Sequence, residues 1–217
     1  ESKERTWELM IYPVVGGFRM VAGKKGFFDG KPEAFSMEES EHAYIIRSKE
    51  HEMILQKETL EISIDRKAIT NLKNISFIFE KESVSASRIQ FSIHENSAIY
   101  GFGERFDSVN QYGKTVALWQ RDACEGCLAS IGNQAYKNIP LVHTSDGFSF
   151  FANTSYRMRM DVGDAVQDYL SVEALGDVFD FYIWSGTPRE AMTAYGTLTG
   201  LPIFPPEWVF EPWAGGG

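Results

Sequence analysis

The sequence has few cysteines and histidines and no long hydrophobic run. Its 217 residues include two cysteines and four histidines. No stretch reaches the roughly 18 consecutive apolar residues that a membrane-spanning helix needs. The first ten residues, ESKERTWELM, are charged where a signal peptide would be apolar. We therefore expect no membrane partner and a cytoplasmic location.

The sequence also contains fewer basic than acidic residues. Twenty-one Lys and Arg residues stand against 30 Asp and Glu residues, which gives a formal net charge of −9. Nucleic acids and anionic membrane surfaces are bound by clusters of Lys and Arg. Neither is expected as a partner, whereas neutral ligands remain open.

The two cysteines form one C-x-x-C pair, Cys124 and Cys127. This spacing occurs in redox pairs and in half-sites for zinc. A redox pair should open a helix after a buried strand, and zinc would need two more ligands, for which the nearest residue, His143, stands alone. We interpret the cysteines as ordinary thiols in a loop and expect no metal or other cofactor.

The chain nevertheless has the material for a core, because 43% of its residues are hydrophobic and 14% are aromatic. Apolar and polar residues alternate with a period of two, as in strands with one buried face. Turn-forming residues separate these short segments, which favours a mainly β fold, an antiparallel β-sandwich. The predicted strands are 60–65, 89–93, 158–162 and 179–183, with shorter candidates at 43–47, 75–79 and 148–152.

One helix is predicted from Thr187 to Thr199. Thr187 can cap its first turn, Pro188 suits the first helical position, and Glu190 completes a reciprocal capping box. Gly200 is a typical residue just beyond a helix end. This is the most specific local signal in the sequence.

Three parts are expected along the chain: a β-sandwich over 1–184, a helix and linker over 185–207, and a strand within 208–217. The last segment is apolar and aromatic, but it is a single strand without a partner. We therefore expect the chain to end inside a second domain.

Four segments, in this order, connect the sequence with a known family. They are YGFGERFDSVNQYG at 100–113, LWQRD at 118–122, QAYKNIPLVHTSDGFSFFANTS at 134–155 and SGTPREAMTAYGTLTGLPIFPPEWVFEPW at 185–213. Together they resemble the amino-terminal region of glycoside hydrolase family 31, the retaining α-glucosidases and α-xylosidases. The first hundred residues are compatible with this resemblance but do not carry it.

The resemblance implies a sandwich of the galactose-mutarotase type followed by a (β/α)8 barrel, whose first strand would be 208–213. Retaining hydrolysis uses two carboxyl groups, and in the family both are aspartates on later barrel segments. The chain would then hold no catalytic residue and be inactive alone, with the barrel as its partner in cis. The implied substrate is an oligosaccharide or another α-glycoside, no cofactor is implied, and a homo-oligomer stays open.

The same resemblance assigns a role to Arg121 and Asp122. In the family, a sandwich loop supplies an aspartate that hydrogen-bonds a sugar hydroxyl near the cleavage point, and Asp122 matches it. An ionised carboxylate accepts charge-assisted hydrogen bonds from hydroxyls. The alternative is a surface ion pair of little energetic weight. Trp213 is the third candidate contact, although the family usually reads Gly-Leu-Trp where this chain has Glu-Pro-Trp.

We expect the other polar and aromatic residues near these motifs to have structural roles. Gly101 and Gly103 predict a bulge or a close backbone approach, with Glu104 and Arg105 paired for structure. Trp119 is expected in the core, with a platform for a sugar ring as the alternative. The run from Tyr136 to Asn138 is interpreted as a loop anchor.

Two other functions remain open from the sequence. A mutarotase-like epimerase would need a convergent acid and base, usually His with Glu, and the fold alone does not imply that activity. A carbohydrate-binding or purely structural sandwich needs neither. The four histidines available for an epimerase are His42, His51, His94 and His143.

Overall fold

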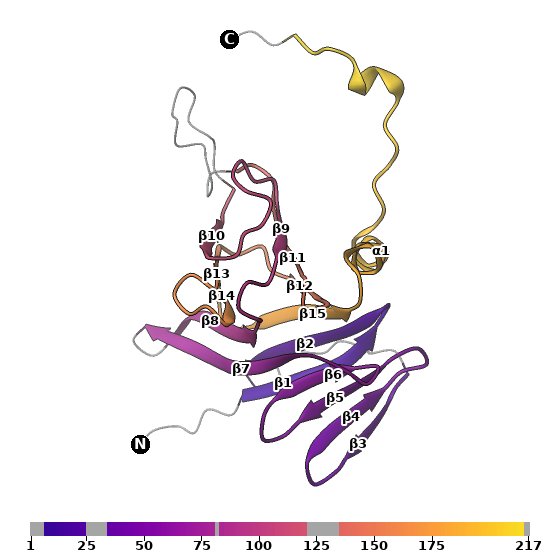
Figure 1. The fold of residues 1–217 in the computed structure, drawn as a ribbon, viewed down its shortest axis with the longest axis vertical. Coiled ribbons are helices and arrows are strands. Elements are labelled where there is room, and N and C mark those ends of the chain that lie inside the picture. Colours follow the sequence, from indigo (N-terminus) through magenta and orange to yellow (C-terminus); the bar gives the residue numbers. More distant parts are fainter. Residues whose placement is uncertain (1–6, 25–33, 81–82, 121–134, 215–217) are drawn as a thin grey trace.

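Two antiparallel sheets pack face to face in the computed structural model, which describes residues 7–24, 34–80, 83–120 and 135–214 (Figure 1). The first sheet has six strands in the order β1-β2-β15-β12-β11-β9. Their bounds are β1 Trp7–Val14, β2 Gly17–Lys24, β15 Phe179–Ser185, β12 Phe148–Ala152, β11 Asn138–Thr144 and β9 Ile99–Gly103. The predicted antiparallel sandwich is confirmed.

The second sheet has nine strands in the order β10-β13-β14-β8-β7-β6-β5-β4-β3. Their bounds are β10 Lys114–Leu118, β13 Met158–Val162, β14 Tyr169–Leu175, β8 Ser83–Ser92, β7 Lys67–Glu80, β6 Glu61–Ile64, β5 Glu52–Gln56, β4 Ala43–Arg47 and β3 Ser36–Glu39. The long strands β7 and β8 pair along most of their length. They join β10, β13 and β14 to strands β3 to β6 (Figure 1), and residues of β4, β5 and β6 also belong to the main core.

Aromatic side chains fill the space between the sheets. Phe91 of the second sheet lies 5.0 Å from Phe150 and 5.7 Å from Phe181 of the first sheet, measured between ring centroids. All three are fully buried. Burying a Phe side chain contributes about 1.5–3 kcal/mol, and such ring pairs add roughly 0.5–1.5 kcal/mol. The period-two pattern at 89–93 and 179–183 therefore identified the inner face correctly.

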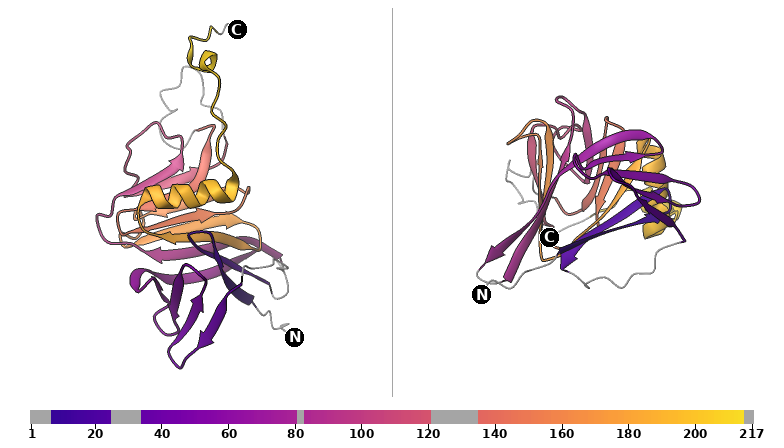
Figure 2. Two further views of the ribbon diagram at one scale, coloured as in Figure 1. Left: turned by 90° about the vertical axis from the view of Figure 1, so that its right-hand side faces the viewer. Right: turned by 90° about the horizontal axis from the view of Figure 1, so that it is seen from below.

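Helix α1 (Pro188–Thr199) covers the outer face of the first sheet (Figure 2). The capping box forms as predicted, because the Thr187 side chain accepts a hydrogen bond from the Glu190 N–H and the Glu190 carboxylate accepts one from the Thr187 N–H. Ala191 and Ala194 pack against Trp184 in a second, smaller core. The helix therefore buries the outer side of strands whose inner side faces the main core.

Residues 208–213 do not form the predicted strand. Glu207–Phe210 is instead a single turn of 3₁₀-helix, η1, at the end of a segment that extends away from the sandwich (Figure 1). The segment is apolar but uncovered, with Ile203 91% and Phe204 89% exposed. A strand obtains its hydrogen bonds from a neighbour, and no described strand lies beside this segment. Its domain assignment stays a prediction.

No helix in the described part of the chain is both long enough and apolar enough to cross a membrane.

Candidate functional site

Residues 121–134 lie outside the described residues, and with them Arg121, Asp122, Cys124 and Cys127, but the two ends of this segment are well defined. Gln120 and Ala135 pair as an isolated parallel bridge. The Gln120 Oε1 atom accepts hydrogen bonds from the backbone N–H of Asn138 at 3.0 Å and from its Nδ2 at 2.9 Å. The described residues on either side of 121–134 are therefore held together at one fixed point, formed by Gln120, Ala135 and Asn138.

Asn138 also ties this point to Arg105. The Arg105 guanidinium donates to Asn138 Oδ1 at 2.7 Å and to the carbonyl oxygen of Ala117 at 3.3 Å. Burial lowers the pKa of Arg105, while the nearby Asp107 carboxylate acts in the opposite direction. Arg105 therefore has a structural role, as predicted, but the predicted pairing with Glu104 is wrong, because the guanidinium donates to an amide and to backbone carbonyl groups instead. The anchor role predicted for Asn138 is confirmed as well.

Two glycines of β9 let the backbone approach β11 closely. Gly101 has φ +113° and Gly103 has φ +82°, both in the region that disfavours side chains. A Cβ at Gly103 would overlap the carbonyl oxygen of Lys137 and the N–H of Ile139, both of which are backbone atoms. The register between β9 and β11 shifts here. This confirms the predicted close approach and explains why Asn138 reaches Arg105.

A hollow of about 310 Å³ opens beside this fixed point. Trp119 forms part of its wall and is 52% exposed, so the prediction that Trp119 lies in the core is wrong. Tyr156, which is 61% exposed, lines the same hollow. Thr154, Ser155, Gln120 and Asn138 add hydroxyl and amide groups, and the lining also includes Leu118, Pro140 and Met158. Exposed aromatic faces next to hydrogen-bonding groups suit a sugar or a packed protein surface.

Thr154 and Ser155 lie at the end of the family segment 134–155, but the sequence predicts no role for them or for Tyr156. They follow β12 and reach the hollow because β12 lies beside β11, the strand that begins at Asn138. Strand pairing brings them to the same hollow as Trp119, so composition and periodicity do not reveal them.

Trp213, the third candidate contact, lies elsewhere. Its side chain is 72% exposed, and its indole N–H donates to the carbonyl oxygen of Val209 at 3.0 Å. It is not among the residues that line the hollow. The described residues therefore do not bring Trp213 and Trp119 into one site.

The histidines give no support to an epimerase. His143 is buried against the Ser149 hydroxyl, 2.8 Å from its Nδ1, and burial lowers its pKa. His51 is bonded to Asp65 at 2.7 Å. Glu190, which lines the same hollow as His51, is already the acceptor in the capping box. No group of three or more potential metal ligands occurs among the described residues.

Asn138→Ala should destabilise the sandwich by about 2–4 kcal/mol, because it removes several hydrogen bonds and leaves the partly buried Arg105 charge without an amide acceptor. Denaturant titration measures this change. Asn153→Ala is the matched control, since among the described residues its exposed side chain donates only to Asp180, and it should cost about 1 kcal/mol or less. Equal losses in the two variants would contradict the anchoring role.

Two antiparallel sheets with a capped helix on one outer face define a β-sandwich domain. The family model described as the glycosyl hydrolase 31 N-terminal galactose mutarotase-like domain matches residues 3–161, and the chain belongs to this family.

Known proteins that resemble the chain are much longer. It is 34% identical to the α-xylosidase XylQ of Lactiplantibacillus pentosus over 131 residues, which cover 60% of this chain and 16% of that protein. It is 26% identical to an α-xylosidase of Emericella nidulans, covering 62% of this chain and 16% of that one. The cycloalternan-forming enzyme of Listeria monocytogenes, solved with a pentasaccharide substrate, has the same fold, with a TM-score of 0.83, 18% identity, and coverage of 96% of this chain and 21% of that chain.

Proposed function

We propose that this chain is the amino-terminal domain of a retaining, exo-acting α-glycosidase, an α-xylosidase or α-glucosidase that removes terminal α-linked sugars. The family match and the two α-xylosidase relatives support the reaction class. The chain spans 16% of each of these relatives. The catalytic carboxylates then belong to a (β/α)8 barrel in the same polypeptide, which residues 208–217 begin.

The observation that carries the proposal is the fixed point formed by Gln120, Ala135 and Asn138. It holds both ends of the segment with Arg121 and Asp122 beside a hollow lined by Trp119 and Tyr156. We assign Asp122 the task of accepting hydrogen bonds from a sugar hydroxyl at the barrel mouth. A carboxylate needs no shifted pKa for this task, because it acts in its ordinary ionised form.

The uncovered apolar segment after α1 supports a second domain packed next to the sandwich. Ile203, Phe204 and Phe210 are each more than two thirds exposed. Large apolar side chains exposed together along one segment mark an interaction surface. The barrel is the partner that this proposal assigns to them, and Trp213 would contact the substrate only once that barrel is in place.

A panel of nitrophenyl glycosides tests the substrate class on the intact polypeptide. We expect turnover of the α-xyloside or the α-glucoside with retention of anomeric configuration, and no turnover of the β-glycosides. Because the specificity-determining barrel loops lie outside this chain, the panel must contain both α-glycosides. Activity on neither of them would contradict the proposal.

A further inference from the structure

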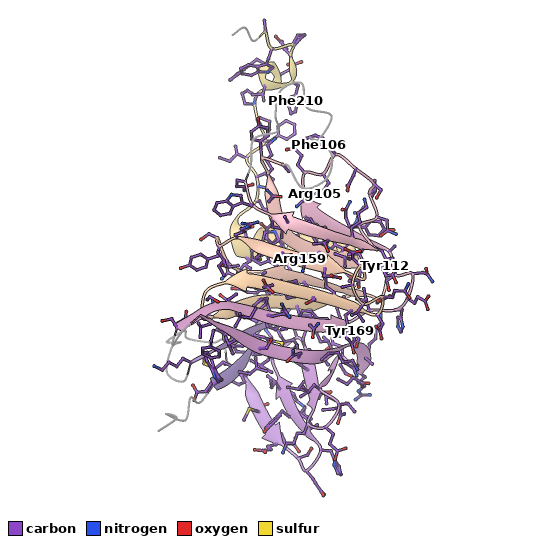
Figure 3. All side chains as sticks on the ribbon, turned by 90° about the vertical axis from the view of Figure 1, so that its left-hand side faces the viewer. Arg105, Phe106, Tyr112, Arg159, Tyr169 and Phe210 are labelled. Atoms are coloured by element: carbon purple, nitrogen blue, oxygen red, sulfur yellow. The ribbon has the colours of Figure 1, made fainter. Side chains whose placement is uncertain are left out.

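A second hollow lies on the outer face of the nine-stranded sheet, on strands β8, β13 and β14. It has a volume of about 150 Å³ and is lined by Arg88, Gln90, Arg159, Asp161, Ala165, Val166, Tyr169, Ser171 and Glu173. Figure 3 shows Arg159 and Tyr169 on the face of the sheet that is turned towards the viewer. The residues lining the hollow at the base of 121–134 are all different. This hollow is therefore separate from the proposed glycosidase site.

Strand register places its polar groups side by side. Ser171 lies opposite Gln90 and opposite Asp161 in the neighbouring strands, and Glu173 lies opposite both Arg88 and Arg159. The Gln90 amide, the Ser171 hydroxyl and the Tyr169 hydroxyl make no side-chain hydrogen bond to another described residue. They are donors and acceptors that a ligand in the hollow can satisfy.

The charges around the hollow balance. Arg88 donates to Glu173 from its Nε at 3.1 Å. Arg159 lies 4.0 Å from Asp161, so two cations meet two carboxylates. An anion such as phosphate would need an excess of positive charge. A neutral ligand rich in hydroxyl groups is favoured instead, because each hydroxyl both donates and accepts hydrogen bonds.

The rim of the hollow is held in place by the turn between β13 and β14. The Asp161 carboxylate accepts from the backbone N–H of Asp164 at 3.0 Å and of Ala165 at 3.2 Å. The Tyr112 hydroxyl donates to the carbonyl oxygen of Gln167 at 2.9 Å. Ala165 and Val166 therefore form a fixed apolar edge next to the Tyr169 ring. At about 30 Å³ for each water molecule, the hollow holds roughly five waters, which is the size of one sugar ring.

We propose that this hollow is a non-catalytic binding site for a single neutral pyranose unit. Gln90, Ser171 and Tyr169 form the site, which is flanked by the Arg88–Glu173 and Arg159–Asp161 ion pairs. The Tyr169 ring and the edge at Val166 contact the apolar face of the sugar, and the amide and hydroxyl groups bind its hydroxyls. The proposal does not depend on the glycosidase activity.

Amide chemical-shift mapping tests the proposal on the 217-residue chain labelled with ¹⁵N. The probes are methyl α-xyloside and methyl α-glucoside, with inorganic phosphate as the anionic alternative. We expect saturable shifts around 88–90, 159–161 and 165–173 with at least one glycoside, and a dissociation constant on the order of 1 mM, as for a ligand of this size. Shifts with phosphate alone, or with neither glycoside, would overturn the proposal.

Substitutions locate the binding. Gln90→Ala and Tyr169→Ala should each weaken glycoside binding about two- to tenfold, because each removes hydrogen bonds or ring contact. Tyr100→Ala is the matched control, since Tyr100 is 37% exposed on β9 of the other sheet, and it should leave the constant unchanged. Well-dispersed amide spectra establish that each variant folds. Unchanged binding in both hollow variants, or shifts confined to the amides near Trp119, would contradict the site.

Discussion

Replacing Asp122 by alanine in the intact polypeptide, which we propose is an α-glycosidase, is expected to lower kcat/KM for the α-glycoside about 10- to 150-fold. The proposed role is to orient the sugar by accepting hydrogen bonds, and removing a charged hydrogen-bond partner costs about 1.5–3 kcal/mol. Asp122 transfers no proton and attacks no atom in this account. The loss should therefore be several orders of magnitude smaller than the loss of a catalytic aspartate in the barrel.

Two further variants separate orientation from a surface ion pair with Arg121. Asp122→Asn keeps the shape and part of the acceptor capacity, so its kcat/KM should fall less than that of Asp122→Ala. Asp177→Ala removes an exposed aspartate from the turn between β14 and β15 and should leave kcat/KM unchanged. If Asp122→Ala also stays within about twofold of wild type, the residue is a surface charge of the kind that contributes little.

Gly103→Ala is expected to destabilise the sandwich by about 2–5 kcal/mol. Its φ of +82° costs a residue with a side chain about 1–2 kcal/mol. The added Cβ would also overlap backbone atoms of Lys137 and Ile139, and overpacking of this kind costs about 1–3 kcal/mol. The free energy of unfolding from denaturant titration measures the sum.

Gly113 offers a matched control for the steric part of this effect. Its φ is +76°, but a Cβ added there would have no atom of the described residues within 4 Å. Gly113→Ala should therefore cost only about 1–2 kcal/mol for the backbone conformation. If the two variants lose the same free energy, the close approach of β9 to β11 is not what fixes the strand pair that ends at Asn138.

The sequence predicts best where one local pattern determines the structure. The capping box at Thr187 and Glu190 satisfies backbone donors within a single turn, so the helix begins where the pattern places it. The alternation at 179–183 gives β15 because one side of this strand faces the main core. Both signals are read from adjacent residues and need no partner elsewhere in the chain.

Prediction from the sequence fails where the local structure depends on a partner that is distant in the sequence. Strand β9 carries two glycines at positive φ and does not show the period-two pattern. It is a strand because its backbone pairs with β11. The 208–213 segment has the composition of a buried strand, but no described strand lies beside it. Trp119 resembles a core residue by type, yet the strand that ends at Leu118 leaves it at the surface.

The same limit applies to the candidate site. The sequence pointed to Asp122 and Arg121 through a family resemblance, and these residues remain a proposal. It did not point to Tyr156, which lines the same hollow as Trp119 because β12 pairs with β11. Hollows formed by residues that are far apart in the sequence need the three-dimensional arrangement before they can be recognised.

Hydrolysis of nitrophenyl α-xyloside and α-glucoside by the 217-residue chain alone, measured next to the intact polypeptide, tests the central claim most directly. The account predicts turnover by the intact polypeptide and none by the isolated chain, because both catalytic carboxylates are assigned to the barrel. Turnover by the isolated chain that persists through repeated purification and is lost on unfolding would contradict it.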